Sequence, residues 1–209
     1  MARIRRWAAK DSTIVSIHDA TLDRVSNGTG KVWEYTYEEL LQFDFGACHG
    51  DEFRGMKIPT FEDILKKFAG HVIMNVHIKH VNDVDSLPDA TIREIVRLIN
   101  KYDCRKYCYF MRGNPEILRQ CREAAPDIAR CAGASRPDHD LVEKALAYDC
   151  KKIQLFQPHF RHLPENYLED IIARAHAHGI AVNIFWSDKV DEARAYLDMG
   201  CGTRKYLMR

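Results

Sequence analysis

From about residue 72 onward, the chain alternates between short β-rich runs and amphipathic helical segments joined by short connections. The runs are mostly continuous apolar stretches, which is typical of parallel strands buried on both faces. They cover 72–78, 107–110, 128–132, 153–156 and 180–186. Strand and helix in alternation predict a parallel sheet or an α/β barrel.

The segments between these runs carry clear helix signals. Apolar residues recur at i, i+3, i+4 and i+7 within 92–99 and within 168–175. The Asn-Pro-Glu sequence at 114–116 combines an N-cap, a proline in the first helical position and an acid in the first turn. Gly179 and Gly200 stand where a helix C-cap is needed. These signals predict helices of ordinary length between the strands.

The first seventy residues follow a different rhythm. Residues 14–17 predict a strand, and 26–30 are rich in turn formers. Thr36-x-x-Glu39 and Thr60-x-x-Asp63 are capping-box signatures, each followed by apolar residues. We therefore expect residues 20–70 to form a small helical insertion over one end of the sheet.

The length sets a limit on the fold. At 209 residues the chain is long enough for one domain over residues 1–209, but a complete eight-stranded barrel usually takes about 250 residues. The arginine- or lysine-bearing runs 3–7 and 203–208 are poorly patterned, and each could add one strand. The expectation is an α/β fold, a TIM-type (β/α) barrel that is incomplete.

Composition excludes several classes of protein. Lys and Arg number 31 against 30 for Asp and Glu, so the net charge of +1 gives no basis for binding nucleic acid or an anionic membrane surface. No apolar run approaches the ~20 residues of a membrane span, and no signal peptide is recognisable. The 7 cysteines show no repeated spacing, which favours reduced thiols over zinc or disulfides and predicts a cytoplasmic protein.

Polar residues at strand ends are the candidates for chemistry, because catalytic groups of α/β barrels cluster there. His18 follows a predicted strand and is supported by Asp19, so it could act as a general acid or base; its alternative is a structural role at the strand end. Lys79 could hold a phosphate as a point charge, or be a solvated loop lysine. Trp186 could line a ligand pocket or simply pack in the core.

Several motifs of the first seventy residues occur together in a specific order. Residues 11–30 contain His18-Asp19, Thr21-Leu22-Asp23-Arg24 and Asn27-Gly28, and residues 45–62 contain Phe45-Gly46 and Ile58-Pro59-Thr60. With this spacing, the chain resembles the glycerophosphodiester phosphodiesterase family over roughly residues 11–200.

The resemblance implies a barrel in which two histidines carry out acid–base chemistry on a small-molecule glycerophosphodiester. His18 matches one of them, and the other belongs to a His-Arg-Gly motif on the first strand. A Ca²⁺ or Mg²⁺ ion is implied against the phosphate, held by a Glu-x-Asp and by the Glu of a later Glu-x-Lys. Carboxylates suit such hard cations, and the ion offsets charge that builds on phosphorus.

The sequence departs from this pattern at most of those places. It contains no His-Arg-Gly, so we expect the first strand of the barrel to be missing. Arg3-Ile4-Arg5 stands where the Glu-x-Asp is implied, and His77-Ile78-Lys79 stands in place of Glu-x-Lys. His77 is therefore a doubtful metal ligand, and we expect divalent-cation binding to be weak or absent. The alternative is an imidazole-preferring metal such as Zn²⁺ on His18 and His77.

Two functions remain open from the sequence. One is hydrolysis of glycerophosphodiesters to glycerol 3-phosphate and an alcohol. The other is a non-catalytic, truncated or degenerate barrel that binds phosphodiesters weakly. A barrel without its first strand exposes unpaired strand edges, which predicts a homo-oligomer.

Overall fold

The computed structural model describes residues 2–79, 87–133, 140–156, 163–164 and 166–202. The chain divides into two compact units, Met1–Phe110 and Met111–Arg209. Within the described ranges, none of the helices has the length and apolar content needed to cross a membrane. The expectation of a single domain over residues 1–209 stays a prediction.

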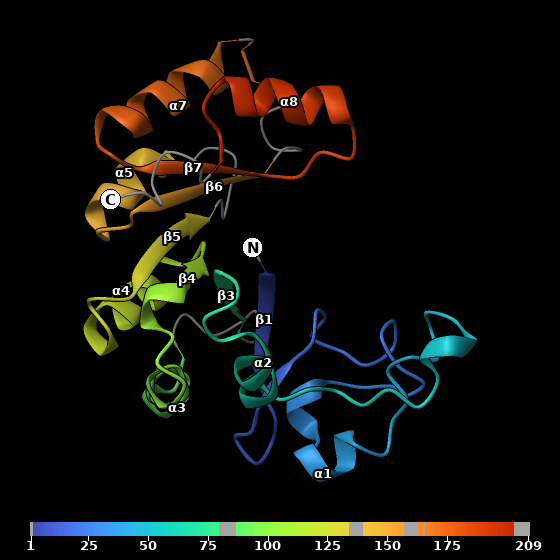
Figure 1. The fold of residues 1–209 in the computed structure, drawn as a ribbon. Helices are drawn as coiled ribbons and strands as arrows, with labels where there is room; N and C mark the ends of the chain where they lie inside the picture. Colours follow the sequence, from blue (N-terminus) through green and yellow to red (C-terminus); the bar gives the residue numbers. More distant parts are fainter. Residues whose placement is uncertain (1, 80–86, 134–139, 157–162, 165, 203–209) are drawn as a thin grey trace. The chain divides into compact units, whose positions relative to one another are not determined.

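The first unit is built on a small mixed sheet (Figure 1). Strand β1 (Ala2–Ala8) pairs in parallel with β3 (Met74–Ile78). The other neighbour of β3 is β4 (Cys108–Arg112), whose residues fall partly in each unit. Strand β2 (Ile14–Ser16) runs antiparallel to the end of β1. The run at 3–7 therefore does form a strand. The strand before His18 is a hairpin partner and not one of the parallel strands.

The turn of this hairpin is set by local chemistry. Ser12 has a positive φ of 67°, which places it in the left-handed region. The Asp11 carboxylate accepts hydrogen bonds from the backbone N–H groups of Thr13 at 3.1 Å and Tyr37 at 3.1 Å. These bonds hold the pKa of Asp11 below its usual value, against the opposing effect of burial. The carboxylate thus ties the turn to the segment that follows it.

The described residues of the first unit form three α-helices and three short 3₁₀ turns. Helix α1 (Tyr37–Leu40) and helix α2 (Phe61–Phe68) both begin at the predicted capping boxes, with Thr36 and Thr60 as N-caps. Helix α3 (Asp89–Lys101) buries its predicted apolar face. The 3₁₀ turns are η1 (Val32–Glu34), η2 (Asp51–Phe53) and η3 (Arg105–Tyr107).

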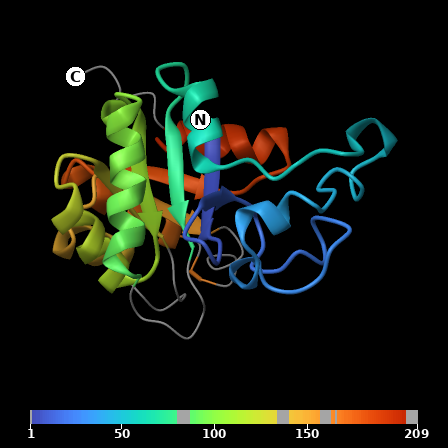
Figure 2. The ribbon, with the colours of Figure 1, turned by 90° about the horizontal axis from the view of Figure 1, so that it is seen from below.

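The insertion is shorter than the expected 20–70. Glu62 of α2 accepts hydrogen bonds from Lys101 Nζ at 2.6 Å and from the Tyr102 hydroxyl at 2.8 Å, so α2 is joined to the end of α3. Helix α2 is therefore the crossover helix between the parallel strands β1 and β3, not part of the insertion. The segment between β2 and α2, blue to cyan in Figures 1 and 2, projects to the side of β1 and β3 opposite α3. It shares an apolar core with β1 and β2, which includes Trp7, Val15, Leu22, Val32, Leu40 and Ile58.

The second unit repeats a strand–helix pattern on a parallel sheet. Strand β5 (Ala129–Gly133) pairs with β6 (Lys152–Phe156), which pairs with β7 (Ala181–Phe185). Its helices are α4 (Pro115–Ala124), α5 (Leu141–Ala147), α7 (Tyr167–Ala177) and α8 (Val190–Asp198). All the strands expected in this half are present. The tail run 203–208 lies outside the described residues.

The helix ends in this unit follow the predicted signals. The Asn114 side chain accepts a hydrogen bond from the backbone N–H of Ile117 at 3.1 Å, which confirms the N-cap of α4. Gly179 and Gly200 both have positive φ, at 69° and 92°, as residues after helix ends require.

The second unit also contains a buried arginine, Arg130, which is 2% exposed. Its guanidinium contacts the Asp149 carboxylate at 2.8 Å and also donates to nearby backbone carbonyls.

Candidate active site

His18 lies just beyond strand β2, on the surface of the first unit. Ile17 before it is buried, whereas 53% of the His18 side chain is exposed. Its Nδ1 contacts Oδ1 of Asp19 in a short hydrogen bond. The ring nitrogen left to meet a substrate is therefore Nε2. An accessible imidazole with its inner nitrogen fixed by a carboxylate is the arrangement that general acid–base chemistry needs.

Arg24 holds the Asp19 carboxylate from the other side. Its Nε donates to Oδ2 of Asp19 at 2.7 Å, and its Nη2 donates to Oδ1 at 2.9 Å. Such a bidentate pair fixes the plane of the carboxylate as well as its position. The Asp19 carboxylate in turn raises the pKa of Arg24 above its usual value. The sequence alone did not predict this role of Arg24. The residue was visible only as part of the Thr21-Leu22-Asp23-Arg24 motif.

The loop that carries Arg24 is held by a small hydrogen-bond network. The Ser26 hydroxyl donates to the carbonyl of Leu22 at 3.0 Å and accepts from the N–H of Gly28 at 3.0 Å. Asn27 Oδ1 accepts from the N–H of Asp44 at 2.8 Å. At Gly28 an added Cβ would lie 2.6 Å from a ring carbon of Phe43, so only glycine fits against that ring. The motif residues around 22–28 thus shape the loop from which Arg24 reaches Asp19.

Strand β3 presents a second row of polar residues. Asn75 and His77 are two apart on the strand and so point to the same face, and Lys79 follows the strand end, half-buried. Asn75 is fully buried and His77 is 8% exposed. Neither the Oδ1 nor the Nδ2 of Asn75 has a hydrogen-bond partner in the described part of the chain. An amide buried without partners is costly, so a contribution to stability does not explain why asparagine stands at position 75.

The backbone places the two arginine positions beside this row. In the parallel register of β1 and β3, Arg3 lies opposite Asn75 and Arg5 lies opposite His77. The positions at which the resemblance implies three metal carboxylates are therefore neighbours in one sheet. They hold two arginines and a histidine instead.

These residues do not fit a Ca²⁺ or Mg²⁺ ion. Hard cations take carboxylate and carbonyl oxygens, whereas the imidazole of His77 suits softer ions. Among the residues that the structure describes, no group of three or more His, Cys, Asp or Glu side chains could hold a metal. We therefore derive no chemical step through a hard cation. Metal binding by His77 stays a prediction.

Trp186 lies in the second unit, directly after β7. Its ring is 43% exposed and its centroid lies 4.9 Å from that of Phe185 and 5.7 Å from that of Phe156. The indole N–H donates to Asp188 Oδ2 at 3.0 Å. The exposed face remains available for stacking, while the polar edge is already satisfied within its own loop.

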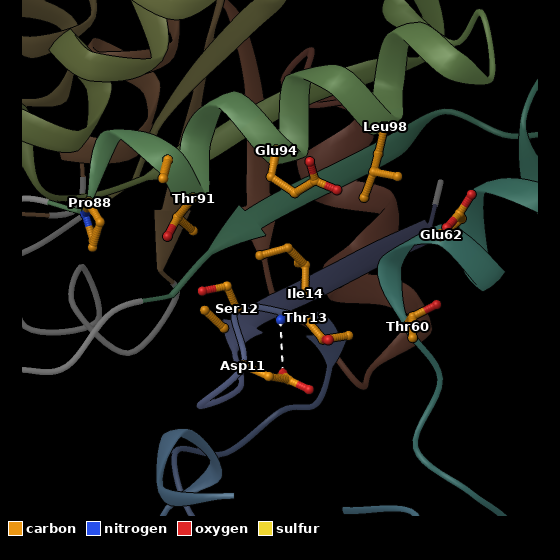
Figure 3. A pocket seen from close by; sticks show the side chains of 12 residues that line it. Asp11, Ser12, Thr13, Ile14, Thr60, Glu62, Pro88, Thr91, Glu94 and Leu98 are labelled. Carbon is orange, nitrogen blue, oxygen red and sulfur yellow. Dashed lines mark hydrogen bonds between the residues drawn. The ribbon is translucent and has the colours of Figure 1, made fainter. Parts of the chain in front are cut away.

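The first unit also contains a cavity of about 640 Å³ between the hairpin turn and helices α2 and α3 (Figure 3). Its polar lining includes Asp11, Thr91, Glu62 and Glu94. His18, Asp19, Lys79 and His77 are not among its lining residues. Its carboxylates are already bonded, Glu62 to Lys101 and Glu94 to Arg97. This cavity is therefore separate from the candidate acid–base group.

Comparison with known proteins identifies the group to which this arrangement belongs. A model of the glycerophosphoryl diester phosphodiesterase family matches residues 8–202. The glycerophosphodiester phosphodiesterase of Caldanaerobacter subterraneus subsp. tengcongensis is 29% identical over 120 residues, which are 57% of this chain and 48% of that protein. That of Bacillus subtilis is 26% identical over 129 residues, 57% of this chain and 44% of that protein. The chain thus spans less than half the length of either relative.

Solved structures show the fold. A phosphodiesterase of Oleispira antarctica, in complex with the product sn-glycerol-3-phosphate, aligns with a TM-score of 0.80 and 21% identity, over 95% of this chain and 77% of that one. A glycerophosphodiester phosphodiesterase of Agrobacterium tumefaciens aligns with a TM-score of 0.73 and 18% identity, over 94% and 78%. These proteins are TIM-type α/β barrels, and this chain supplies part of such a barrel.

The family generally uses a divalent metal ion, and strand β3 of this chain contains no aspartate or glutamate. The match begins at the last residue of β1, and it includes the His18 loop and strands β2 to β7. The chain belongs to the glycerophosphoryl diester phosphodiesterase family.

Proposed function

We propose that this chain binds small glycerophosphodiesters and hydrolyses them slowly to glycerol 3-phosphate and an alcohol, with His18 as the acid–base group. The observation that carries the proposal is the hydrogen-bonded series His18, Asp19 and Arg24, in which Arg24 holds Asp19 at 2.7 and 2.9 Å and Asp19 contacts the imidazole. Building such a series serves no packing purpose, because His18 is half-exposed. Family membership supports the choice of substrate.

Each residue has a specific part in this proposal. Water attacks phosphorus and the P–O bond to the alcohol breaks, while His18 Nε2 gives its proton to the leaving alkoxide, a step that typically contributes about 10²–10⁴-fold to a rate. The proton released by the attacking water then restores the imidazolium. Asp19 fixes the orientation of the ring through its contact with Nδ1. Lys79, half-buried after β3, supplies a positive charge for the phosphate. Trp186 stays a proposed ligand contact through its exposed ring face.

We further propose that Ca²⁺ or Mg²⁺ binds weakly or not at all. The support is the donor set: arginines at positions 3 and 5 and a histidine at 77 lie side by side in the β1–β3 register. Arginine is positively charged and offers no oxygen ligand to a divalent ion, and without the ion less of the charge on the phosphate is compensated. Turnover is therefore expected to be slow.

The test is identification of the products from glycerophosphocholine. The purified full chain is incubated with this substrate and the products are followed by ³¹P NMR. Glycerol 3-phosphate as the phosphorus-bearing product would support the proposal. Choline phosphate, or an unchanged substrate resonance with a folded sample, would contradict it.

A second candidate function is phosphodiester binding without turnover. The fully buried Asn75 amide, which has no partner in the described part of the chain, favours it, because a bound ligand could satisfy that amide. Saturable binding of glycerophosphocholine by calorimetry, with no product in the NMR experiment, would favour this candidate. Absence of binding would exclude it.

We also propose a homo-oligomer and a cytoplasmic location. β2 pairs with β1 only from Arg6 onward, so one edge of the segment 2–5 has no strand partner among the described residues of the first unit. Open strand edges promote pairing between chains. The described cysteines are all free thiols, as in reducing compartments. Light scattering of the eluted protein tests the oligomer, and a monomer would contradict it. Cell fractionation tests the location, and a secreted protein would contradict it.

A further inference from the structure

Two cysteines meet in the connection between helix α3 and strand β4, a region that the proposed function does not use. Cys104 precedes the turn η3 and Cys108 begins β4. Their Sγ atoms lie 3.9 Å apart, and the two residues are 0% and 4% exposed.

The backbone fixes this contact. The N–H of Cys104 donates to the carbonyl of Ile99 at 3.1 Å, which ties it to the end of α3. The N–H of Tyr107 donates to the carbonyl of Cys104 at 3.0 Å and closes the turn that brings Cys108 back. A disulfide needs an S–S distance of about 2.0 Å, so the sulfurs must approach by roughly 2 Å. Side-chain rotation about two flexible torsions can supply a movement of that size.

The two sulfurs are also chemically suited to react. The Cys108 thiol donates a hydrogen bond to Cys104, and this bond lowers the pKa of Cys104 below its usual value. A lower pKa means more thiolate, which is the reactive form. Burial acts in the opposite direction on other cysteines: it raises the pKa of Cys121 to about 12 and that of Cys150 to about 11.

Access to the pair depends on one short segment. The turn η3 contains no buried residue, and Tyr107 in it is 41% exposed. A single exposed 3₁₀ turn opens more readily than a strand or a long helix. Arg105 and Lys106 in the same turn place positive charge near the sulfurs, which favours an anionic reagent.

We propose that Cys104 and Cys108 form an intramolecular disulfide by exchange with a small anionic disulfide such as oxidised glutathione. The Cys104 thiolate attacks one sulfur of the reagent and releases one glutathione thiolate, which takes up a proton. The Cys108 thiol then loses its proton and attacks the Cys104 sulfur of this mixed disulfide, releasing the second glutathione. Two protein thiols are oxidised and one small disulfide is reduced to two thiols, so atoms and electrons balance.

Peptide mass spectrometry tests the proposal directly. Trypsin cuts after Arg105 and Lys106, so the two cysteines fall in separate peptides, Tyr102–Arg105 and Tyr107–Arg112. The native full chain is incubated with oxidised glutathione, free thiols are blocked with iodoacetamide in denaturant, and the digest is analysed without reductant. We expect loss of both alkylated peptides and the appearance of one cross-linked species.

Two variants sharpen the experiment. Cys104→Ser should abolish the cross-link, whereas the matched Cys121→Ser, at a buried cysteine whose pKa is raised, should leave it intact. Full alkylation of Cys104 and Cys108 after native incubation would overturn the proposal, whatever the variants do. So would a cross-link that forms only when the chain is incubated in denaturant, because the native contact would then have no part in it.

Discussion

His18 and His77 lie in the same unit of the molecule but in opposite surroundings. The His18 side chain is 53% exposed and is supported by Asp19, which Arg24 holds in turn. His77 is 8% exposed and shares a strand face with Asn75, whose buried amide has no partner among the described residues. One histidine stands in a complete local arrangement, and the other stands where a carboxylate is implied.

The difference shows what each kind of chemistry demands of the fold. The support of His18 comes from a segment of seven residues, 18–24, so one loop can carry it intact. The hard-cation site that the resemblance implies needs carboxylates from two strands, at positions 3, 5 and 77, which are paired in the β1–β3 register. The supports of an acid–base group can therefore lie within one loop, whereas a hard-cation site depends on several strands.

The largest effect is expected from His18→Ala. Removal of the proton donor should lower the rate of glycerophosphocholine hydrolysis by about 10²–10⁴-fold, or to the limit of detection. The rate is measured as glycerol 3-phosphate released per unit time. His49→Ala, at an exposed histidine in the insertion, is the matched control and should not change the rate. Equal rates in His18→Ala and wild type would remove His18 from the mechanism.

The next largest effect is a gain in Ca²⁺ affinity when His77 and the two arginine positions beside it are changed. The triple change Arg3→Glu, Arg5→Asp and His77→Glu puts the implied carboxylates back, and Ca²⁺ affinity measured by calorimetry should rise by at least roughly tenfold. Loss of even a supporting residue of a metal site typically costs about 10–100-fold in affinity.

A control for this gain uses the same change of charge at exposed positions of the insertion. Arg54→Glu, Lys57→Asp and His49→Glu should leave Ca²⁺ affinity near the wild-type value. Equal affinity in the two triple variants would mean that β1 and β3 do not form the family's metal site.

A smaller effect concerns stability. Asn75→Leu replaces a buried amide that has no partner with an apolar side chain of similar size, so the free energy of unfolding should rise by about 1–3 kcal/mol. Urea denaturation measures it. Gln154→Leu is the contrast: Gln154 accepts a hydrogen bond from Asn183 at 3.2 Å, so its loss should destabilise the chain. Destabilisation by Asn75→Leu as well would mean that Asn75 has a partner in solution.

The smallest effect is expected from Arg24→Lys. A lysine keeps the charge near Asp19 but loses the bidentate contact, so kcat should fall by roughly two- to fivefold while KM stays the same. Steady-state kinetics separates the two constants. A large rise in KM would instead make Arg24 a substrate-binding residue and not a positioning residue.

Much of the fold could be predicted from the sequence because it depends on local patterns. The continuous apolar runs predicted β3–β7, and the capping boxes at Thr36 and Thr60 fixed where α1 and α2 begin. The end of the insertion could be given only approximately, because the role of α2 depends on its contact with Lys101, about forty residues away. Contacts of that kind leave no local pattern in a sequence.

The candidate site could be predicted only in part. His18 and Asp19 are adjacent in the chain, so their association was visible in the sequence. The role of Arg24 depends on the path of a loop shaped by Ser26 and Gly28, and the isolation of the Asn75 amide depends on burial in three dimensions. Neither follows from residue spacing.

The most direct test of the account is the metal dependence of wild-type turnover. Hydrolysis of glycerophosphocholine is measured with added Ca²⁺, Mg²⁺ or Mn²⁺ and with a chelator, on one folded preparation. We expect a slow rate that is the same in all four conditions, because the His18 group is present and positions 3, 5 and 77 carry no carboxylate. Metal-stimulated turnover that the chelator abolishes would contradict it.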